Sequence, residues 1–381
     1  MQVKAHEIDA IVKDSSLVGP SVFTDPDRFV WGASVIKGSD SKYHMFYATW
    51  PCGDTIERFS DSWVIRSSIA YAVSNKPDRD YQFKKIILQG RKHSQDSLAW
   101  DAEMVTNPHI KYFDGRYYLY YVGSKDPGKP DVGTPGNSLN KRNRIQQSQQ
   151  IGMISFENFN DLLAGNWERP THPLLSPRTR VKENNIINPS PASTQIKPDN
   201  IIVTNPSVVQ RPSDGKFLLY FKGNIYDPHW KGVHGVALAD RPEGPFKAID
   251  DIMFEVKLED GKLASTEDPF VWYHQEHDRF YSVVKDFTGK VTGNEPGLAL
   301  LQSNNGIDWS PSQHPHFMKK SVCLKSKDTI DLHRFERPQL LISEDGSPQV
   351  LFAAGSLVNI NSRNDGKSFN VHVSLTNTDQ P

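Results

Sequence analysis

Thr204-Asn205-Pro206-Ser207-Val208 is one copy of a short phrase that decides the fold of this 381-residue chain. In each copy a polar residue and a proline open an apolar strand, and an aromatic-rich strand follows after a turn. The other clear copies are Thr106-Asn107-Pro108-His109-Ile110, Glu267-Asp268-Pro269-Phe270-Val271 and Glu336-Arg337-Pro338-Gln339-Leu340, and Trp31-Gly32-Ala33-Ser34-Val35 is a degenerate first copy. The turns include Asp114-Gly115 and Asp214-Gly215, and Asp-Gly between two apolar runs is a strong hairpin signal.

The recurrence of the phrase predicts the architecture. Copies about 60 to 100 residues apart indicate a radial array of small sheets, because each sheet needs neighbours on both faces to bury its apolar side chains. We therefore predict an all-β fold, a five-bladed β-propeller with four-stranded antiparallel blades. The propeller is expected over residues 29–381, after an N-terminal extension over residues 1–28. The widest interval, between Asn107 and Asn205, indicates an insertion.

Charge and composition exclude several function classes. The net charge is −1, so we expect neither nucleic acid nor a membrane as partner, and a neutral substrate is the simpler expectation. The chain has no run of eighteen apolar residues, and its first residues lack the apolar core of a signal peptide. We expect a cytoplasmic protein, or a periplasmic or secreted one if an export signal has been removed. The sequence does not indicate the oligomeric state.

The leading residues of the phrases should meet where the innermost strands reach the propeller axis. This group contains Asn107, Asn205, Asp268 and Arg337, with Glu267 and Glu336 one position earlier and Asp101 shortly before the second phrase. Burying carboxylates costs several kcal/mol unless they are paired, so their recurrence indicates a use. Carboxylates on different blades suit glycoside hydrolysis, which needs one group to protonate the leaving oxygen and another to activate water or attack the anomeric carbon. For any one of these carboxylates taken alone, the alternative is a structural role, as a strand-end cap or in a salt bridge.

At these residues the chain resembles the five-bladed propeller glycoside hydrolases, the group that includes families 43, 62, 32, 68 and 117. The resemblance extends from about Phe29 to Ala354. In family 43 a modulating Asp directly precedes a proline, and the acid Glu stands two residues before a proline one blade later. The resemblance therefore implies Asp268 as the residue that tunes the acid and Glu336 as the acid.

The resemblance leaves the base open. Family 43 places it in an Asp-Pro of the first blade, where this chain has Gly32, and Asp25 slightly upstream is a reserve candidate. The spacing from Asp101 to the later Asp and Glu is more similar to family 117, the exo-acting 3,6-anhydro-L-galactosidases, and implies Asp101 as the base. In that family a histidine has also been implicated as the acid, and His333 stands three residues before Glu336.

A further set of residues is expected to contact the sugar. Aromatic rings stack on the apolar C–H face of a sugar, although most tryptophans in a propeller pack between blades. For His109, the alternative is a structural histidine whose ring nitrogens are both hydrogen-bonded. The predicted substrate-binding residues are Trp50, Trp100, Asn107, His109, Asn205, Glu267, Trp272, His333 and Arg337. No cofactor is required, and the metal content is left open, since the blade starts would suit a structural Ca²⁺ but no contiguous motif demands one.

Three functions from different classes remain at this point. The first is an exo-acting, inverting glycoside hydrolase for plant-wall or algal oligosaccharides, with Glu336, Asp101 and Asp268 as its catalytic carboxylates. The second is a transferase or phosphorylase with a phosphate pocket that includes Arg337, His333 and Arg334. The third is a noncatalytic carbohydrate-binding propeller. An inverting pair should hold the Asp101 and Glu336 carboxyl groups roughly 6.5 to 9.5 Å apart across one cavity.

Overall fold

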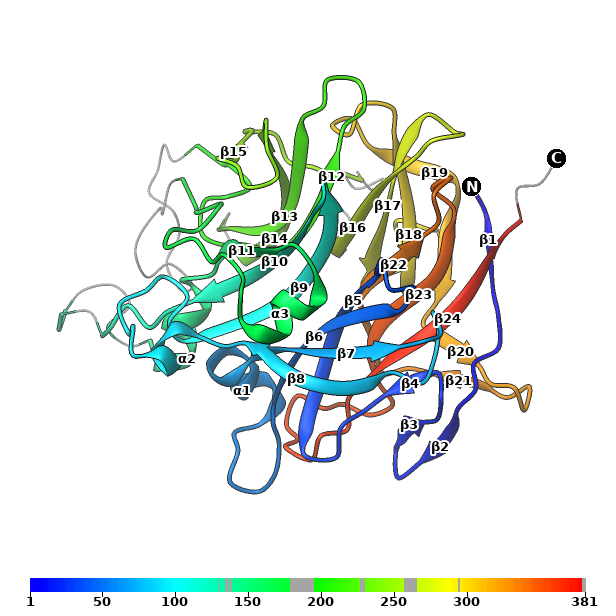
Figure 1. The fold of residues 1–381 in the computed structure, drawn as a ribbon, viewed down its shortest axis with the longest axis horizontal. Coiled ribbons are helices and arrows are strands. Elements are labelled where there is room, and N and C mark those ends of the chain that lie inside the picture. The colour runs from blue at the N-terminus through cyan, green and yellow to red at the C-terminus, as the bar shows by residue number, and fades with distance from the viewer. Residues whose placement is uncertain are drawn as a thin grey trace.

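Five antiparallel sheets form the blades of a β-propeller in the computed structural model (Figure 1). The structure describes residues 1–129, 131–133, 137, 139–178, 195–226, 230–256, 266–293 and 295–378. The five innermost strands make a closed ring in which each strand contacts the innermost strands of the two neighbouring blades. None of the described helices has the length and apolar character needed to cross a bilayer.

The blades follow the chain in order. Blade one contains β5 (Arg28–Lys37), β6 (Tyr43–Pro51), β7 (Ser68–Ser74) and β8 (Gln82–Leu88), and blade two contains β9 (Met104–Phe113), β10 (Arg116–Ser124) and β11 (Gln150–Phe156). Blade three contains β12 (Val203–Gln210), β13 (Phe217–Tyr226), β14 (Trp230–Ala239) and β15 (Lys247–Ala248), and blade four contains β16 (Thr266–His274), β17 (Arg279–Asp286), β18 (Gly297–Ser303) and β19 (Ser310–Lys319). Blade five contains β22 (Arg334–Ile342), β23 (Pro348–Ser356), β24 (Phe369–Asn377) and β1 (Val3–Ala5), with β4 (Val22–Phe23) also on β24.

The remaining elements lie between or beside the blades. They are β2 (Ile11–Lys13), β3 (Ser16–Val18), α1 (Phe59–Arg66), the short 3₁₀ helix η1 (Arg91–Ser94), α2 (Lys141–Gln146), α3 (Phe159–Ala164), β20 (Ser321–Cys323) and β21 (Thr329–Asp331). The insertion expected in the second interval supplies α2 and α3, which flank β11. The predicted five-bladed fold is confirmed, and in the described residues blade two has three strands where four were expected.

The N-terminal residues join the two ends of the chain. Strand β1 pairs antiparallel with β24, with Val3 opposite Asn377 and Ala5 opposite Leu375. The segment expected as an extension over residues 1–28 therefore contributes the outer strand of blade five, beside the C-terminal strand (Figure 1). Pairing the first strand with the last blade covers that edge, which would otherwise expose unpaired backbone groups.

The recurring phrase corresponds to a β-bulge in each innermost strand. The register of the inner strand shifts at the same point in all five blades. The residue at that point has a left-handed backbone in every blade: φ is 41° at Gly32, 52° at Asn107, 54° at Asn205, 58° at Asp268 and 55° at Arg337. Gly, Asn and Asp tolerate this conformation, whereas a long side chain such as Arg adopts it rarely. Except in blade one, the proline after the bulge takes a position that needs no ladder donor.

A buried polar network ties the inner strands together below the bulges. The backbone N–H of Val208 donates to His109 Nε2 at 2.9 Å, so Nδ1 carries the proton that it donates to Gln339 Oε1 at 3.0 Å. Ser34 Oγ also donates to Gln339 and accepts from the backbone N–H of Ile110. His109 is completely buried and bridges blades two, three and five. The prediction that it lines the substrate site is corrected, because both of its ring nitrogens are used to hold blades together.

The buried histidines predict that stability falls in mild acid. Burial lowers the pKa of His109 to about 3, and burial likewise lowers the pKa of His234 and of His372 to about 3. An unfolded histidine has a pKa of about 6.5, so between that pH and about 3 the unfolded state binds more protons. The stabilisation is complete above pH 6.5 and is lost as the pH falls. From pH 7 to pH 5, each such histidine is expected to cost about 2 kcal/mol of unfolding free energy.

Urea unfolding at pH 7 and pH 5 measures this effect. We expect His109→Gln to lose less stability than the wild type over this interval, while His93→Gln, a change at an exposed histidine, loses as much as the wild type. An identical pH dependence in His109→Gln and the wild type would contradict the assignment.

Candidate active site

A cavity of about 370 Å³ opens at the axial end where the bulges meet. Its wall combines aromatic side chains from blade one and α1 with polar and charged side chains from the other blades. The lining residues are Trp31, Trp50, Phe59, Trp63, Thr106, Asn107, Gln146, Gln149, Ile202, Thr204, Asn205, Lys222, Asn224, Glu267, Asp268, Lys285, Phe287, Arg334, Glu336 and Arg337. Of the predicted site residues, the structure brings Trp50, Asn107, Asn205, Glu267, Asp268, Glu336 and Arg337 to this one cavity.

The bulge residues form a hydrogen-bonded chain across the cavity floor. Asn107 Nδ2 donates to Asn205 Oδ1 at 2.6 Å, and Asn205 Nδ2 donates to Asp268 Oδ1 at 2.5 Å. The Asp268 carboxylate also accepts from the backbone N–H of Arg337 at 3.0 Å and from its guanidinium at 3.3 Å. Asp268 is almost fully buried, so these bonds fix its position and occupy both of its oxygens.

Blade one departs from the other four at this ring. A Cβ atom placed on Gly32 would lie 3.2 Å from Arg337 Cγ and 3.3 Å from its Nε. The Arg337 side chain therefore fills the space that the first blade leaves empty. Family 43, one of the families that the chain resembles, has a water-activating Asp in the first blade. This chain has a glycine there, covered by a guanidinium. The axial position of blade one thus supplies no base.

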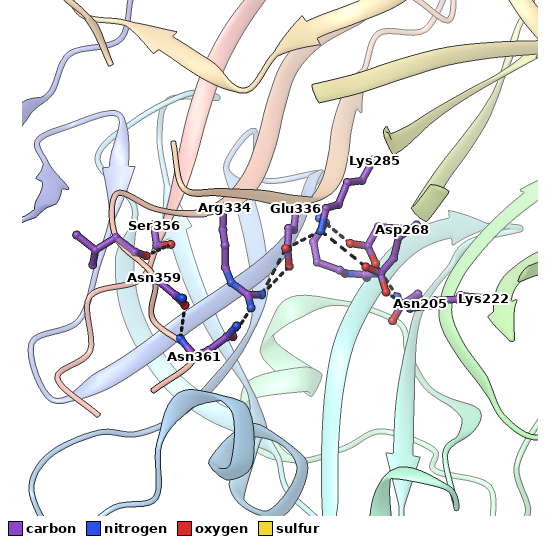
Figure 2. A network of polar contacts seen from close by, with 12 residues as sticks. Asn205, Lys222, Asp268, Lys285, Arg334, Glu336, Ser356, Asn359 and Asn361 are labelled. Carbon is purple, nitrogen blue, oxygen red and sulfur yellow. Dashed lines mark hydrogen bonds and ion pairs between the residues drawn. The ribbon is translucent and has the colours of Figure 1, made fainter. Parts of the chain in front are cut away.

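Two glutamates stand one residue before the bulges of blades four and five. Glu336 Oε1 accepts a hydrogen bond from Lys285 Nζ at 2.6 Å, and Arg334 NH1 lies 3.2 Å from its Oε2. Glu267 forms an ion pair with Lys222, and its Oε2 lies 3.8 Å from Lys285 Nζ. Figure 2 shows Glu336 between Arg334 and Lys285. One ammonium group therefore contacts both glutamates.

The sequence did not point to Lys222, and it left Lys285 open between a contact to a hydroxyl or acidic group and a surface ion pair. Both lie on the second strand of a blade, Lys222 opposite Thr204 and Lys285 opposite Glu267. Each therefore faces the residue that precedes the bulge. A usable signal existed, because each lysine directly follows a largely apolar run, residues 217–221 before Lys222 and residues 280–284 before Lys285. The use of that signal depends on the hairpin register. Burial lowers the pKa of Lys222, and the positive charge of Lys285 adds to that effect.

The aromatic wall comes from blade one and the helix that follows β6. Trp31 and Trp50 lie on β5 and β6, and Phe59 and Trp63 lie on α1. The Phe59 ring packs against both tryptophans at centroid distances of 5.0 and 5.3 Å. The Arg334 guanidinium lies 5.7 Å from the Trp31 ring centroid and 5.3 Å from that of Phe59. These rings are inclined to one another, at 66° for Trp31 and 52° for Trp50 against Phe59, and Trp63 is the ring of this wall that is half-buried rather than buried.

The structure does not bring Asp101 to the cavity. Its carboxylate is fully buried and binds Arg91 Nε at 2.9 Å, Arg169 NH2 at 2.7 Å and the Tyr121 hydroxyl at 2.7 Å. Asp101 therefore does not share a cavity with Glu336, and the water-activating role predicted for it is corrected to a structural one. The physical reason is that two guanidinium groups and a hydroxyl surround the carboxylate and leave no place for water or a sugar.

Other predicted residues also lie away from the cavity. Asp25 accepts a hydrogen bond from the backbone N–H of Asp27 in the turn before β5. Trp100 stacks on Tyr121 in the core between blades one and two, and Trp272 donates its indole N–H to a backbone carbonyl in blade five. Both tryptophans are therefore corrected from sugar contacts to wedges between blades. His333 lines a second depression, of about 220 Å³, that shares Lys285, Arg334 and Glu336 with the cavity.

Metal ligands do not gather in the described part of the chain. Among those residues, no group of three or more His, Cys, Asp or Glu side chains is arranged to hold a metal ion. The cavity's carboxylates bind lysine and arginine side chains instead.

Comparisons with known proteins show the fold. No known protein-family model matches the chain, and no curated protein sequence matches it. A solved family 117 glycoside hydrolase of Zobellia galactanivorans is 14% identical, with a TM-score of 0.56 over 98% of this chain and 89% of that one. A thermostable family 43 glycoside hydrolase is 11% identical, with a TM-score of 0.56 over 94% of this chain and 98% of that one. An α-L-arabinofuranosidase from Lactobacillus brevis is 12% identical, with a TM-score of 0.54 over 92% of each chain.

The arrangement around Asp101 predicts a stability defect without a catalytic one. Asp101→Asn would leave two buried guanidinium groups facing a neutral amide, and removing one partner of a buried ion pair costs about 3 to 5 kcal/mol. We expect a loss of about 3 kcal/mol or more in urea unfolding, with glycan binding unchanged in the folded protein. Asp80→Asn, which removes the partner of Lys76 in an exposed ion pair, should cost less than about 1 kcal/mol. Loss of turnover by Asp101→Asn at unchanged stability would restore it as a base.

Proposed function

We propose that this protein is an exo-acting glycoside hydrolase that cleaves plant-wall or algal oligosaccharides in the axial cavity. The observation that carries the proposal is the presence of Glu336 and Glu267 on adjacent blades, on one cavity, with Lys285 in contact with both. Two carboxyl groups across one site are what glycoside hydrolysis needs. The likeness in fold to family 117 and family 43 glycoside hydrolases supports the same reading.

The proposed reaction divides the work between the two glutamates. Glu336 forms ion pairs with Lys285 and Arg334 in the free protein, so in this scheme it first takes a proton from solvent. It then donates that proton to the glycosidic oxygen as the bond from that oxygen to the anomeric carbon breaks. Glu267 attacks the anomeric carbon, and the glycosyl ester that forms is then displaced by water, which gives its proton to Glu336. Asp268 does not touch the reacting atoms in this scheme. It is a positioning residue, because it holds Asn205 and Arg337 in place.

The separation of the glutamates favours a retaining reaction. Lys285 Nζ lies 2.6 Å from Glu336 Oε1 and 3.8 Å from Glu267 Oε2. The sum of these two distances is the upper limit for the separation of the two carboxylate oxygens. Retaining enzymes hold their carboxyl groups roughly 5 to 5.5 Å apart, and inverting enzymes roughly 6.5 to 9.5 Å. With Asp101 outside the cavity, retention replaces the inversion that the sequence led us to expect.

The shape of the cavity supports exo action. Its volume of about 370 Å³ is near the lower end for small-molecule sites. Phe59 and Trp63 of α1 and Gln146 of α2 bound one side, and blades three to five bound the other. A pocket of this volume suits one terminal sugar better than the middle of a chain. The aromatic wall supplies the face on which the terminal sugar stacks.

Removal of either glutamate should abolish turnover while binding remains. We expect Glu336→Gln to lower kcat by about 10²- to 10⁴-fold on aryl glycosides and on plant-wall and algal oligosaccharides, the usual contribution of a general acid. Glu267→Gln should lower kcat by at least as much, because it removes the nucleophile. Glu168→Gln, a change on the exposed surface, is the matched control and should keep wild-type rates. Binding of oligosaccharide without release of sugar by wild type and variants alike would identify a noncatalytic carbohydrate-binding propeller.

The anomer released first reports the stereochemistry. We expect proton NMR during the first minutes of hydrolysis to show a product with the anomeric configuration of the substrate, before mutarotation. First release of the opposite anomer would show that water attacks directly, and it would remove Glu267 as the nucleophile.

A further inference from the structure

The axial cavity holds more positive than negative side chains. Its lining residues include three carboxylates, and each has a cationic partner: Lys222 for Glu267, Lys285 for Glu336 and Arg337 for Asp268. Arg334 is a fourth cation on the same wall, and it shares Glu336 with Lys285. The whole chain carries a net charge of −1, so this local excess is not a consequence of a basic protein.

Arg337 is the cation whose bonding is least complete. Its side chain is only 3% exposed, and among the described residues its Nε finds no hydrogen-bond acceptor. A buried donor of a charged group without an acceptor costs about 1 to 3 kcal/mol or more, and such a group calls for an explanation. An oxyanion of a ligand in the cavity would supply an acceptor for this guanidinium.

Positive charge continues into the second depression. Lys320 and His333 line it together with Lys285, Arg334 and Glu336. Burial lowers the pKa of Lys320, and the charges of Lys285 and Arg334 lower it further. Burial also lowers the pKa of His333, with the charges of Lys320 and Arg334 acting in the same direction. Both groups therefore experience a positive field that Glu336 only partly offsets.

We propose that the sugar bound in the axial cavity carries an acidic group, a carboxylate or a sulfate ester, which accepts hydrogen bonds from Arg337 and is neutralised by Lys222 and Lys285 beside it. Guanidinium and ammonium donors to such an oxyanion form the stronger, charge-assisted class of hydrogen bond. The inference deepens the proposed function, since it names the substrate class of the same cavity. It also replaces the neutral substrate suggested by the net charge, which averages over the whole surface and does not report on one pocket.

The test compares acidic sugars with their neutral parents on the full-length protein. Isothermal titration calorimetry would measure binding of galacturonic acid, glucuronic acid and galactose 6-sulfate against galactose and glucose. At low salt we expect at least one acidic sugar to bind about tenfold or more tightly than its parent, with a smaller advantage at 0.3 M NaCl. Comparing the two uronic acids with galactose 6-sulfate shows whether the site prefers a carboxylate or a sulfate ester. Equal affinity for acidic and neutral sugars would overturn the proposal.

Variants assign the effect to the cavity. Lys222→Met and Arg337→Met should each reduce the preference for the acidic sugar by about tenfold. Lys216→Met removes a surface lysine that pairs with Asp240 and should keep the wild-type preference. If Arg337→Met does not fold, Lys222→Met gives the decisive result. A preference that survives Lys222→Met unchanged, in a variant with wild-type thermal stability, would contradict the proposal.

Two further outcomes separate this inference from the proposed function. Inorganic phosphate that binds more tightly than every acidic sugar, with sugar release that requires it, would overturn the acidic-sugar proposal and make phosphate the co-substrate. Tight binding of an acidic sugar without hydrolysis of its glycosides would support this inference and remove the hydrolase. Hydrolysis of neutral glycosides alone would support the hydrolase and overturn the acidic-sugar inference.

Discussion

A left-handed residue at the same point of every innermost strand is the constraint on which the site depends. In blades two to five the bulge residue carries a side chain at the axial end, and the hydrogen bonds from Asn107 to Asn205 to Asp268 link three of these side chains. Short polar side chains suit this backbone, and those same side chains can bond across the axis. One local backbone requirement therefore produces both the closed ring of strands and the polar floor of the cavity.

A side chain of blade five fills the axial position of blade one, and this gives the site its chemical character. Gly32 contributes no side chain, and Arg337 fills the space above it while binding Asp268. A propeller with a carboxylate in that place would have a water-activating group on the axis. Here the carboxylates Glu267 and Glu336 lie one residue earlier, each beside a lysine. The site therefore combines two accessible carboxylates with a buried guanidinium, which is suited to glycosides with an acidic group.

The sequence predicts the fold and the cavity floor because both follow from one repeated phrase. Polar-proline starts are local features, so Asn205, Asp268 and Glu336 are found without knowledge of the tertiary structure. Asp101 and His109 were misplaced because their positions before or within a phrase do not reveal their partners, which come from η1, the turn after α3 and neighbouring blades. Lys222 was missed and Lys285 was left open for the converse reason, since only the strand register places them opposite the residues that precede the bulges.

A crystal structure of Glu336→Gln with a bound oligosaccharide tests the central claim most directly. The account predicts the terminal sugar in the axial cavity, against the half-buried ring of Trp63. The glycosidic oxygen should lie within hydrogen-bond distance of the amide at position 336, with an acidic substituent on Arg337. A sugar bound on an outer blade face, or in the cavity with its glycosidic bond turned away from position 336 and from Glu267, would contradict it.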